Sequence, residues 1–174
     1  MKSHSLKTTP IVIRASLLFF WGGVCAAFIS TPLLEACGHF FAGSMFRAIF
    51  SLICHQDPAR SFALLGHPWA VCHRCSGIYF GLFLPSLLPL QWNAVVHVPR
   101  YRRAWVIAAT TPLLLDVLLP LAGLWDNTRA SRLVTGVIFG CMLSSLLASA
   151  LAEFMHEAPW KRTGMGVHAQ GGLE

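Results

Sequence analysis

Charged side chains are scarce in this chain of 174 residues: they make up 11% of it, whereas hydrophobic residues make up 55%. Ordinary soluble domains contain roughly 25% charged residues. So few charges cannot cover the surface of so apolar a chain, which excludes an ordinary soluble domain. The net charge of +6 is divided among short segments, and basic residues dispersed in this way do not predict a nucleic-acid partner.

Familiar catalytic motifs are missing as well. The sequence has no phosphate-binding loop, no spacing typical of a Ser-His-Asp triad and no Cys-x-x-Cys-His motif for a c-type haem. It therefore names no reaction and favours a non-enzymatic role.

Long uncharged runs are present instead. Residues 15–34, 76–98 and 133–152 contain no charged side chain, and a fourth run, 104–125, is interrupted only by Asp116. A helix needs about 20 apolar residues to cross a bilayer core, and a helix satisfies its own backbone groups in lipid. We therefore predict an all-α integral membrane bundle with four transmembrane helices.

The stretch 36–53 is harder to interpret, because it has about the minimum spanning length and carries His39 and Arg47. We favour a short partial or interfacial helix, so that a Cys/His-rich loop caps one face of the bundle. Residues 1–160 are expected to form one membrane-embedded domain, followed by a short polar tail at 161–174.

Basic residues in the short loops indicate the orientation. If the short helix does not cross, the N-terminus, the loop around Arg100 and the C-terminal tail place eight basic residues on one side, against four on the other. This predicts a multi-pass protein of the cell membrane with its Cys-rich loop on the non-cytoplasmic side. In either orientation, that loop, the end of the Asp116 helix and residues 126–132 share one membrane face.

The most informative stretches are residues 54–62 and 72–79. Together with an intramembrane aspartate and an Arg…Thr-Gly pair, they resemble a prokaryotic membrane-protein family known as domain of unknown function 2085. The resemblance covers about residues 45–140 and implies a membrane location without an activity. After Asp116, Val117 and leucines stand where the family has glycine and glutamine. The matching positions are Cys54, His55, Gln56, Pro58, Arg60, Ser61, Phe62, Cys72, Arg74, Cys75, Gly77, Ile78, Tyr79, Asp116, Arg132, Thr135 and Gly136.

Three thiols with neighbouring imidazoles are the ligand types of a structural Cys3His metal site, most often a zinc site and alternatively one for iron. The candidate ligands are Cys54, His55, Cys72 and Cys75. His73 and His67 are the next candidates for the fourth position. Such an ion would tie the end of the short helix to the start of the following span.

The thiols have two other interpretations. Cys72 and Cys75 lie at the expected N-terminus of a helix, where free N–H groups favour a thiolate. This is the arrangement of a thiol-disulfide oxidoreductase with a Cys-x-x-Cys pair, in which Cys37 and Cys54 would exchange with it. Alternatively, the cysteines form an inert disulfide or stay buried and reduced.

A carboxylate within a membrane helix is costly and is expected to be paired or functional. Arg74 and Arg132 are the first candidates to pair with Asp116. A structural ion pair is the simpler interpretation; proton handling, or a rim that holds a lipid head group or another anion, is the alternative. The predicted polar site comprises Arg60, Arg74, Asp116, Asn127, Arg129 and Arg132.

Small residues recur at every fourth position of the last span, and Gly77 and Gly81 repeat this spacing. Such faces let helices approach closely, so we expect internal packing, with docking against other membrane subunits as the alternative.

As an accessory subunit of a respiratory or photosynthetic electron-transfer complex, the protein could contact a pigment. His39 and His97 would then be candidate ligands of a tetrapyrrole, either haem or chlorophyll, although an isolated apolar histidine is more often only hydrogen-bonded.

Overall fold

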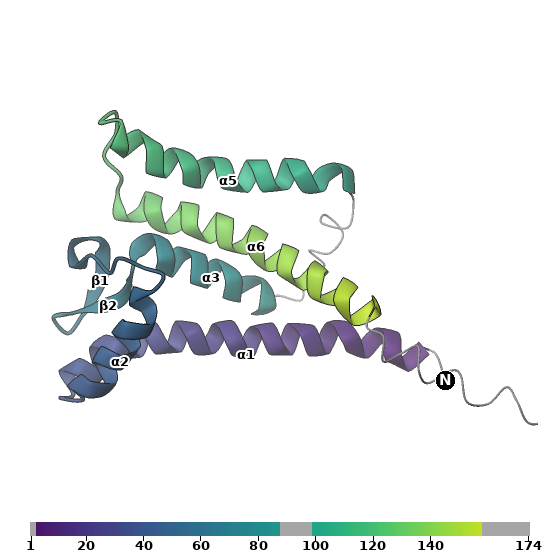
Figure 1. Ribbon diagram of the computed structural model, residues 1–174, viewed down its shortest axis with the longest axis horizontal. Helices are drawn as coiled ribbons and strands as arrows, with labels where there is room; N and C mark the ends of the chain where they lie inside the picture. Colours follow the sequence, from purple (N-terminus) through teal and green to yellow (C-terminus); the bar gives the residue numbers. More distant parts are fainter. Residues whose placement is uncertain (1–2, 88–98, 158–174) are drawn as a thin grey trace, which may run out of the picture.

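The computed structural model of the protein describes residues 3–87 and 99–157, and most of them are helical. Figure 1 shows α3 between α1 and α6, with α5 on the other side of α6. The helices are α1 (Ser3–Ala36), α2 (Phe40–Ser51), α3 (His73–Leu87), α5 (Pro99–Leu121) and α6 (Arg129–Glu157). Between α2 and α3 lie the short 3-10 helix η1 (Pro58–Arg60) and the strands β1 (Ser61–Leu64) and β2 (His67–Cys72).

Within the described residues, three helices are long and apolar enough to cross a membrane: Val12–Ala36, Arg103–Leu121 and Arg129–Leu151. They coincide with three of the four predicted spans. The fourth predicted span, 76–98, includes most of α3. This helix has 15 residues and is about 22 Å long, which is shorter than a bilayer core of about 30 Å. The rest of that predicted span, 88–98, lies outside the described residues. The part of the chain that the structure describes therefore supports three candidate spans, and the fourth predicted span is not confirmed.

The chain turns sharply between α1 and α2. The N–H of His39 donates to the carbonyl oxygen of Leu34 at 2.8 Å, and that of Gly38 donates to Glu35 at 3.1 Å. This is the Schellman pattern that ends a helix, and Gly38 has the positive φ of 83° that the pattern requires. The 12 residues of α2 reach only about 18 Å, so α2 is too short to cross the bilayer by itself.

The sequence patterns do not predict the β-hairpin, so the all-α expectation is wrong in this segment. β1 and β2 are antiparallel, with Leu64 opposite His67. Leu65 and Gly66 join them with φ angles of 53° and 81°, which is typical of a two-residue type I′ turn. A Leu-Gly pair lacks the Asn or Asp that usually marks such turns, and these strands are short. The hairpin returns the chain from the end of α2 to the start of α3.

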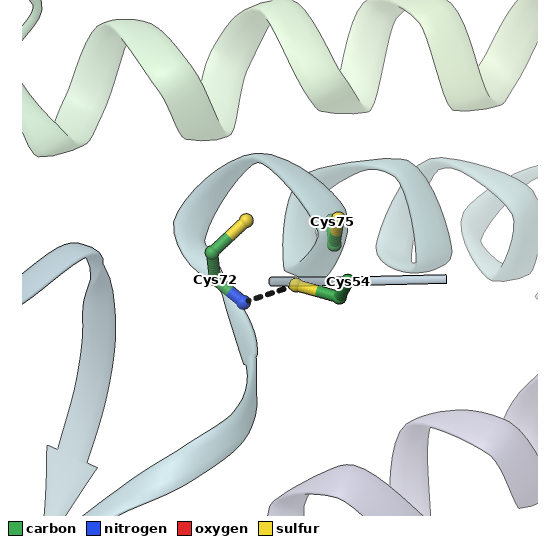
Figure 2. Close-up of side chains that lie close together, drawn as sticks. All are labelled: Cys54, Cys72 and Cys75. Carbon is green, nitrogen blue, oxygen red and sulfur yellow. Dashed lines mark hydrogen bonds between the residues drawn. The ribbon is translucent and has the colours of Figure 1, made fainter. Parts of the chain in front are cut away.

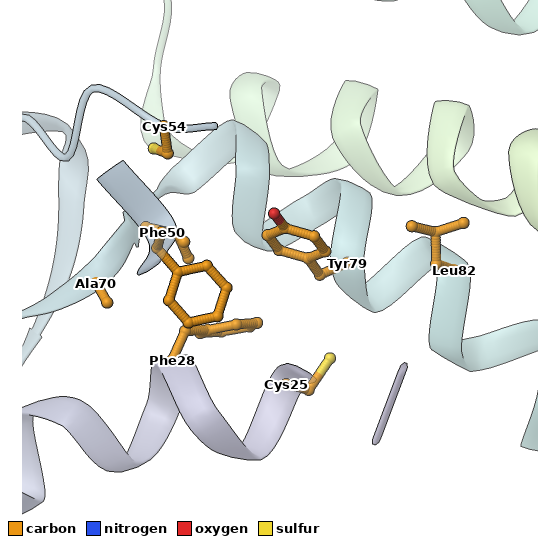
Figure 3. Packing of buried hydrophobic residues seen from close by; sticks show 8 residues of the cluster. Cys25, Phe28, Phe50, Cys54, Ala70, Tyr79 and Leu82 are labelled. Atoms are coloured by element: carbon orange, nitrogen blue, oxygen red, sulfur yellow. The ribbon is translucent and has the colours of Figure 1, made fainter. Parts of the chain in front are cut away.

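Phe28 lies at the centre of the core at this end of the molecule (Figure 3). Its side chain is fully buried, at 0% exposure. Its ring centroid lies 6.1 Å from that of Phe50, 5.6 Å from that of Trp69 and 5.8 Å from that of Tyr79. The four rings come from α1, α2, β2 and α3, and such aromatic pairs contribute about 0.5–1.5 kcal/mol each beyond burial. They hold α2 and the hairpin against the long helices.

A polar network beside this core explains the arginine in α2. Arg47 donates to both carboxylate oxygens of Glu35 on α1, at 2.5 and 2.9 Å. It also donates to the carbonyl oxygen of Pro68 at 2.6 Å, and His67 Nδ1 lies 3.3 Å from Glu35 Oε2. Charge-assisted hydrogen bonds of this kind are stronger than neutral ones, so Arg47 ties α1, α2 and β2 together.

α3 and α6 approach each other through glycines. Gly77 and Gly81 of α3 lie against Gly136 and Gly140 of α6, and a Cβ atom on Gly81 would lie 2.3 Å from the carbonyl oxygen of Val137. The small-residue spacing is therefore used for packing within the chain. Docking of another membrane subunit on the rest of α6 stays a prediction.

Gly81→Ala should lower the free energy of unfolding by about 1–3 kcal/mol, because the methyl group meets backbone atoms rather than a movable side chain. Gly23→Ala is the matched control: it is also a helix glycine, but a Cβ atom there meets nothing within 4 Å. That control should gain about 0.5–1 kcal/mol from the lower chain entropy. Equilibrium unfolding in detergent measures both, and equal stability of the two variants would contradict the close packing.

Candidate metal centre and its polar pocket

The residues singled out in the sequence gather at one end of the helices, where α3 and α6 begin and α5 ends (Figure 1). A pocket of about 670 Å³ lies there. It brings the Cys-rich loop and Asp116, which lies in the candidate span Arg103–Leu121, together in one wall. The polar residues of this wall are Cys54, His55, Asp57, Arg60, Cys72, Arg74, Cys75, Asp116, Asn127 and Arg132.

The sulfur atoms of Cys54, Cys72 and Cys75 lie within 4.8 Å of one another (Figure 2). Cys54 follows α2, Cys72 ends β2 and Cys75 lies in the first turn of α3, and each is a free thiol. A tetrahedral ion with metal–sulfur bonds of about 2.3 Å separates its sulfur ligands by about 3.8 Å. The three sulfurs, which we call the cysteine cluster, are therefore close to the spacing of three corners of a zinc site.

Hydrogen-bond donors stabilise negative charge on this cluster. The N–H groups of Cys72 and Gln56 donate to Cys54 Sγ at 3.3 and 3.5 Å. Hydrogen bonds from the side chains of Cys54 and Cys75, and from the backbone N–H groups of Cys75 and Arg74, lower the pKa of the Cys72 thiol well below its ordinary value. Burial acts in the opposite direction and is outweighed. The cluster is arranged for a thiolate rather than for three neutral thiols.

The described structure joins no histidine to the cysteine cluster. His55 lines the pocket, but its side chain is exposed and its nitrogens lie outside the group of neighbouring ligand atoms. His73 is fully buried and packs edge-on against Phe62, with ring centroids 4.3 Å apart. His67 faces Glu35 instead. Three of the four predicted ligands are together, and an ion held by them would be reached from the pocket.

Asp116 pairs with Arg74 rather than with Arg132. Nε and Nη2 of Arg74 both donate to the carboxylate, the former at 3.1 Å, and Nη2 also donates to the backbone oxygen of Asp116 at 3.0 Å. Ser131 Oγ donates to the other carboxylate oxygen at 3.0 Å, and the side-chain amide of Asn127 donates to the backbone oxygen. The Asp116 side chain is only 6% exposed. The pair joins α3 to α5, and Ser131 connects it to the start of α6.

The other predicted arginines have different surroundings. Arg60 forms an exposed pair with Asp57 at 3.2 Å, and Arg129 is exposed and does not line the pocket. Arg132 lines the pocket, and its guanidinium forms no ion pair with any of the described residues. Its charge is therefore available to the pocket.

Ser131 belongs to the site although the sequence patterns did not identify it, since a serine at a helix start is usually a cap. Of the two candidate tetrapyrrole ligands, the structure describes only His39, which does not line the pocket. His39 is an exposed N-cap residue of α2, and His97 lies outside the described residues. Their role as ligands stays a prediction.

These features define a helical membrane protein with a cysteine cluster and a buried ion pair in one pocket. The family described as "Predicted membrane protein (DUF2085)" matches residues 54–146. The chain belongs to this family, which confirms the resemblance noted in the sequence.

Two relatives extend the comparison, and both are uncharacterised. A protein of Methanocaldococcus jannaschii is 31% identical over 136 residues, which cover 78% of this chain and 87% of the relative. A protein of Methanothermobacter thermautotrophicus is 34% identical over 101 residues, which cover 56% of this chain and 86% of the relative. No solved structure matches the chain significantly.

Asp116→Asn should lower the free energy of unfolding by about 2–4 kcal/mol, because Arg74 then keeps a largely buried charge without its counter-ion. The double variant Asp116→Asn/Arg74→Gln should lose less than the sum of the two single losses. Asp57→Asn is the control, since its pair with Arg60 is 43% and 64% exposed and should contribute less than about 1 kcal/mol. Unfolding in detergent measures all four variants; strictly additive losses would contradict the pairing.

Proposed function

We propose that this membrane protein binds a metal ion, most suitably zinc, through Cys54, Cys72 and Cys75. The observation that carries this proposal is the proximity of the three sulfurs, within 4.8 Å of one another, in a wall that supplies N–H donors to them. Thiolates favour zinc and iron over hard cations such as magnesium. A water molecule or another group from the pocket would complete the coordination.

The proposed role of the ion is structural. Its ligands come from the loop after α2, the end of β2 and the first turn of α3. An ion would therefore tie this loop to the junction between the hairpin and α3. Because Arg74 lies between two of the ligands in the sequence, fixing this turn would also fix the partner of Asp116. The ion would therefore stabilise the pocket rather than catalyse a reaction.

The proposed location is the cell membrane, with the cysteine cluster on the non-cytoplasmic side. The distribution of basic residues between the loops supports this orientation. Exposed apolar side chains of α5, among them Ile107, Leu114 and Leu118, would face lipid or pack against other membrane subunits.

Metal analysis of the purified protein tests the proposal. The wild-type chain should contain about one equivalent of zinc or iron, and Cys72→Ser should lose most of it because a three-thiolate site loses a third of its ligands. Cys37→Ser is the matched control, since Cys37 is exposed and outside the cluster, and it should retain the metal. A metal content that is the same in all three proteins, or absent from all, would sink the proposal.

A thiol-disulfide oxidoreductase is the second candidate function, and the lowered pKa of Cys72 favours it. In that reaction the Cys72 thiolate attacks a substrate disulfide, which releases one substrate thiolate and leaves a mixed disulfide. The Cys75 thiol then attacks the Cys72 sulfur of the mixed disulfide and displaces the second substrate thiolate, which takes up the Cys75 proton. This forms the Cys72–Cys75 disulfide and leaves the substrate reduced to two thiols. Two results together would favour this function over the metal site: the purified protein contains no metal, and the Cys75→Ser variant accumulates a mixed disulfide with its substrate.

The reactivity of Cys72 should depend on pH in a way that reflects its environment. Only the thiolate reacts with iodoacetamide, and a folded-state pKa below the ordinary value keeps the thiolate present to lower pH. In chelator-treated protein, the alkylation rate at Cys72 should change little between pH 8 and pH 6, while that of N-acetylcysteine falls about tenfold per pH unit below its pKa. Mass spectrometry of the labelled peptide measures this. Parallel pH profiles for the two thiols would contradict the lowered pKa.

A further inference from the structure

We propose that the pocket also binds the head group of an anionic lipid that carries a hydroxyl group. The part of its wall formed by the end of α5 and the start of α6 carries this inference: Asn127 and Arg132 are its polar residues, and Pro120 and Leu121 are its apolar ones. The inference goes beyond the metal site, because none of these residues belongs to the cysteine cluster.

The arginines of the wall outnumber its aspartates. Arg74 is paired with Asp116, and Arg60 is paired with Asp57. Arg132 therefore supplies a positive charge that no described carboxylate neutralises. A guanidinium presents several donors in a plane that matches the oxygens of a phosphate or carboxylate group. A divalent ion on three thiolates would leave a negative charge on the sulfurs, so an anionic ligand is expected at Arg132 rather than at the ion.

Asn127 supplies an acceptor that needs a donor. Its side-chain nitrogen donates to the backbone oxygen of Asp116, which fixes the orientation of the amide, since the reversed amide would place oxygen against oxygen. The other end, Oδ1, is buried and accepts no hydrogen bond from the described residues. A buried acceptor without a partner costs about 1–3 kcal/mol. A ligand hydroxyl beside the anionic group would remove this cost.

The position of the pocket selects a lipid rather than a free anion. Leu121 ends one candidate span and Arg129 begins the next, so the pocket lies at the boundary between the bilayer core and water, where lipid head groups lie. Ile53 and Leu121, both in the wall, are 72% and 79% exposed. They offer apolar surface that the acyl chains of a lipid can contact, whereas a soluble phosphate has no apolar group to place there.

Native mass spectrometry of the full chain in detergent, with added lipid, tests the proposal. Phosphatidylglycerol, which has one negative charge and two hydroxyl groups on its head group, should bind at about one molecule per chain and about tenfold more tightly than phosphatidylcholine. Phosphatidylmethanol has the same charge without the hydroxyl groups, and it should bind more weakly than phosphatidylglycerol because it leaves Asn127 Oδ1 unpaired.

Two pairs of variants locate the site. Arg132→Gln should weaken phosphatidylglycerol binding about fivefold to tenfold, whereas Arg129→Gln, on the same helix but outside the wall, should leave it unchanged. If Arg132→Gln does not fold, Ile53→Glu replaces it: this change adds a negative charge at an exposed wall position. It should weaken binding of the anionic lipid, while the neutral control Ile53→Gln should not.

Three results would overturn the proposal: equal binding of phosphatidylglycerol and phosphatidylcholine, equal losses in Arg129→Gln and Arg132→Gln, or inorganic phosphate that binds as tightly as the lipid. Equal binding of phosphatidylmethanol and phosphatidylglycerol would overturn the hydroxyl contact. The metal content of the same samples separates this proposal from the previous one. Lipid selectivity without metal would refute only the metal site, and metal without lipid selectivity would refute only the lipid site.

Discussion

A carboxylate in a membrane-spanning helix needs a counter-charge, and the Arg74–Asp116 pair supplies it between two helices that are far apart in the sequence. The pair fixes the end of α5 against the first turn of α3, and Ser131 and Asn127 join it from the segment that starts α6. The pocket exists because these three helix ends are held at one place. Removing either charge would expose the other to a poorly polar environment, so the arrangement depends on both.

The junction between β2 and the first turn of α3 serves two sites at once. Cys72 and Cys75 contribute to the cysteine cluster, while Arg74, between them, forms the ion pair with α5. About one and two turns after Arg74, Gly77 and Gly81 allow the backbone of α6 to approach. The short stretch 72–81 therefore combines two of the three proposed metal ligands, the counter-ion of Asp116 and a close contact between α3 and α6. This coupling explains why an ion at the cysteines would stabilise the polar part of the pocket without touching it.

Much of the helical architecture follows from the charge-free runs, because lipid permits few alternatives to a helix. The hairpin cannot be predicted in the same way, because Leu65-Gly66 forms a type I′ turn without the Asn or Asp that usually marks such a turn. The number of membrane crossings predicts that the three cysteines and Asp116 lie at the same membrane face, and in the structure they line one pocket. The sequence offered two partners for Asp116, because only side-chain geometry distinguishes Arg74 from Arg132. Ser131 and the unpaired oxygen of Asn127 depend on that same geometry.

The metal site is the claim on which the proposed function depends. X-ray absorption at the zinc K edge, recorded on zinc-loaded protein, measures the ligands of the ion directly. We expect three sulfur neighbours at about 2.3 Å and one lighter neighbour at about 2.0–2.1 Å, from Cys54, Cys72, Cys75 and a group of the pocket. A first shell of nitrogen and oxygen alone would show that zinc binds elsewhere, and would contradict the assignment of the cysteine cluster as a metal site.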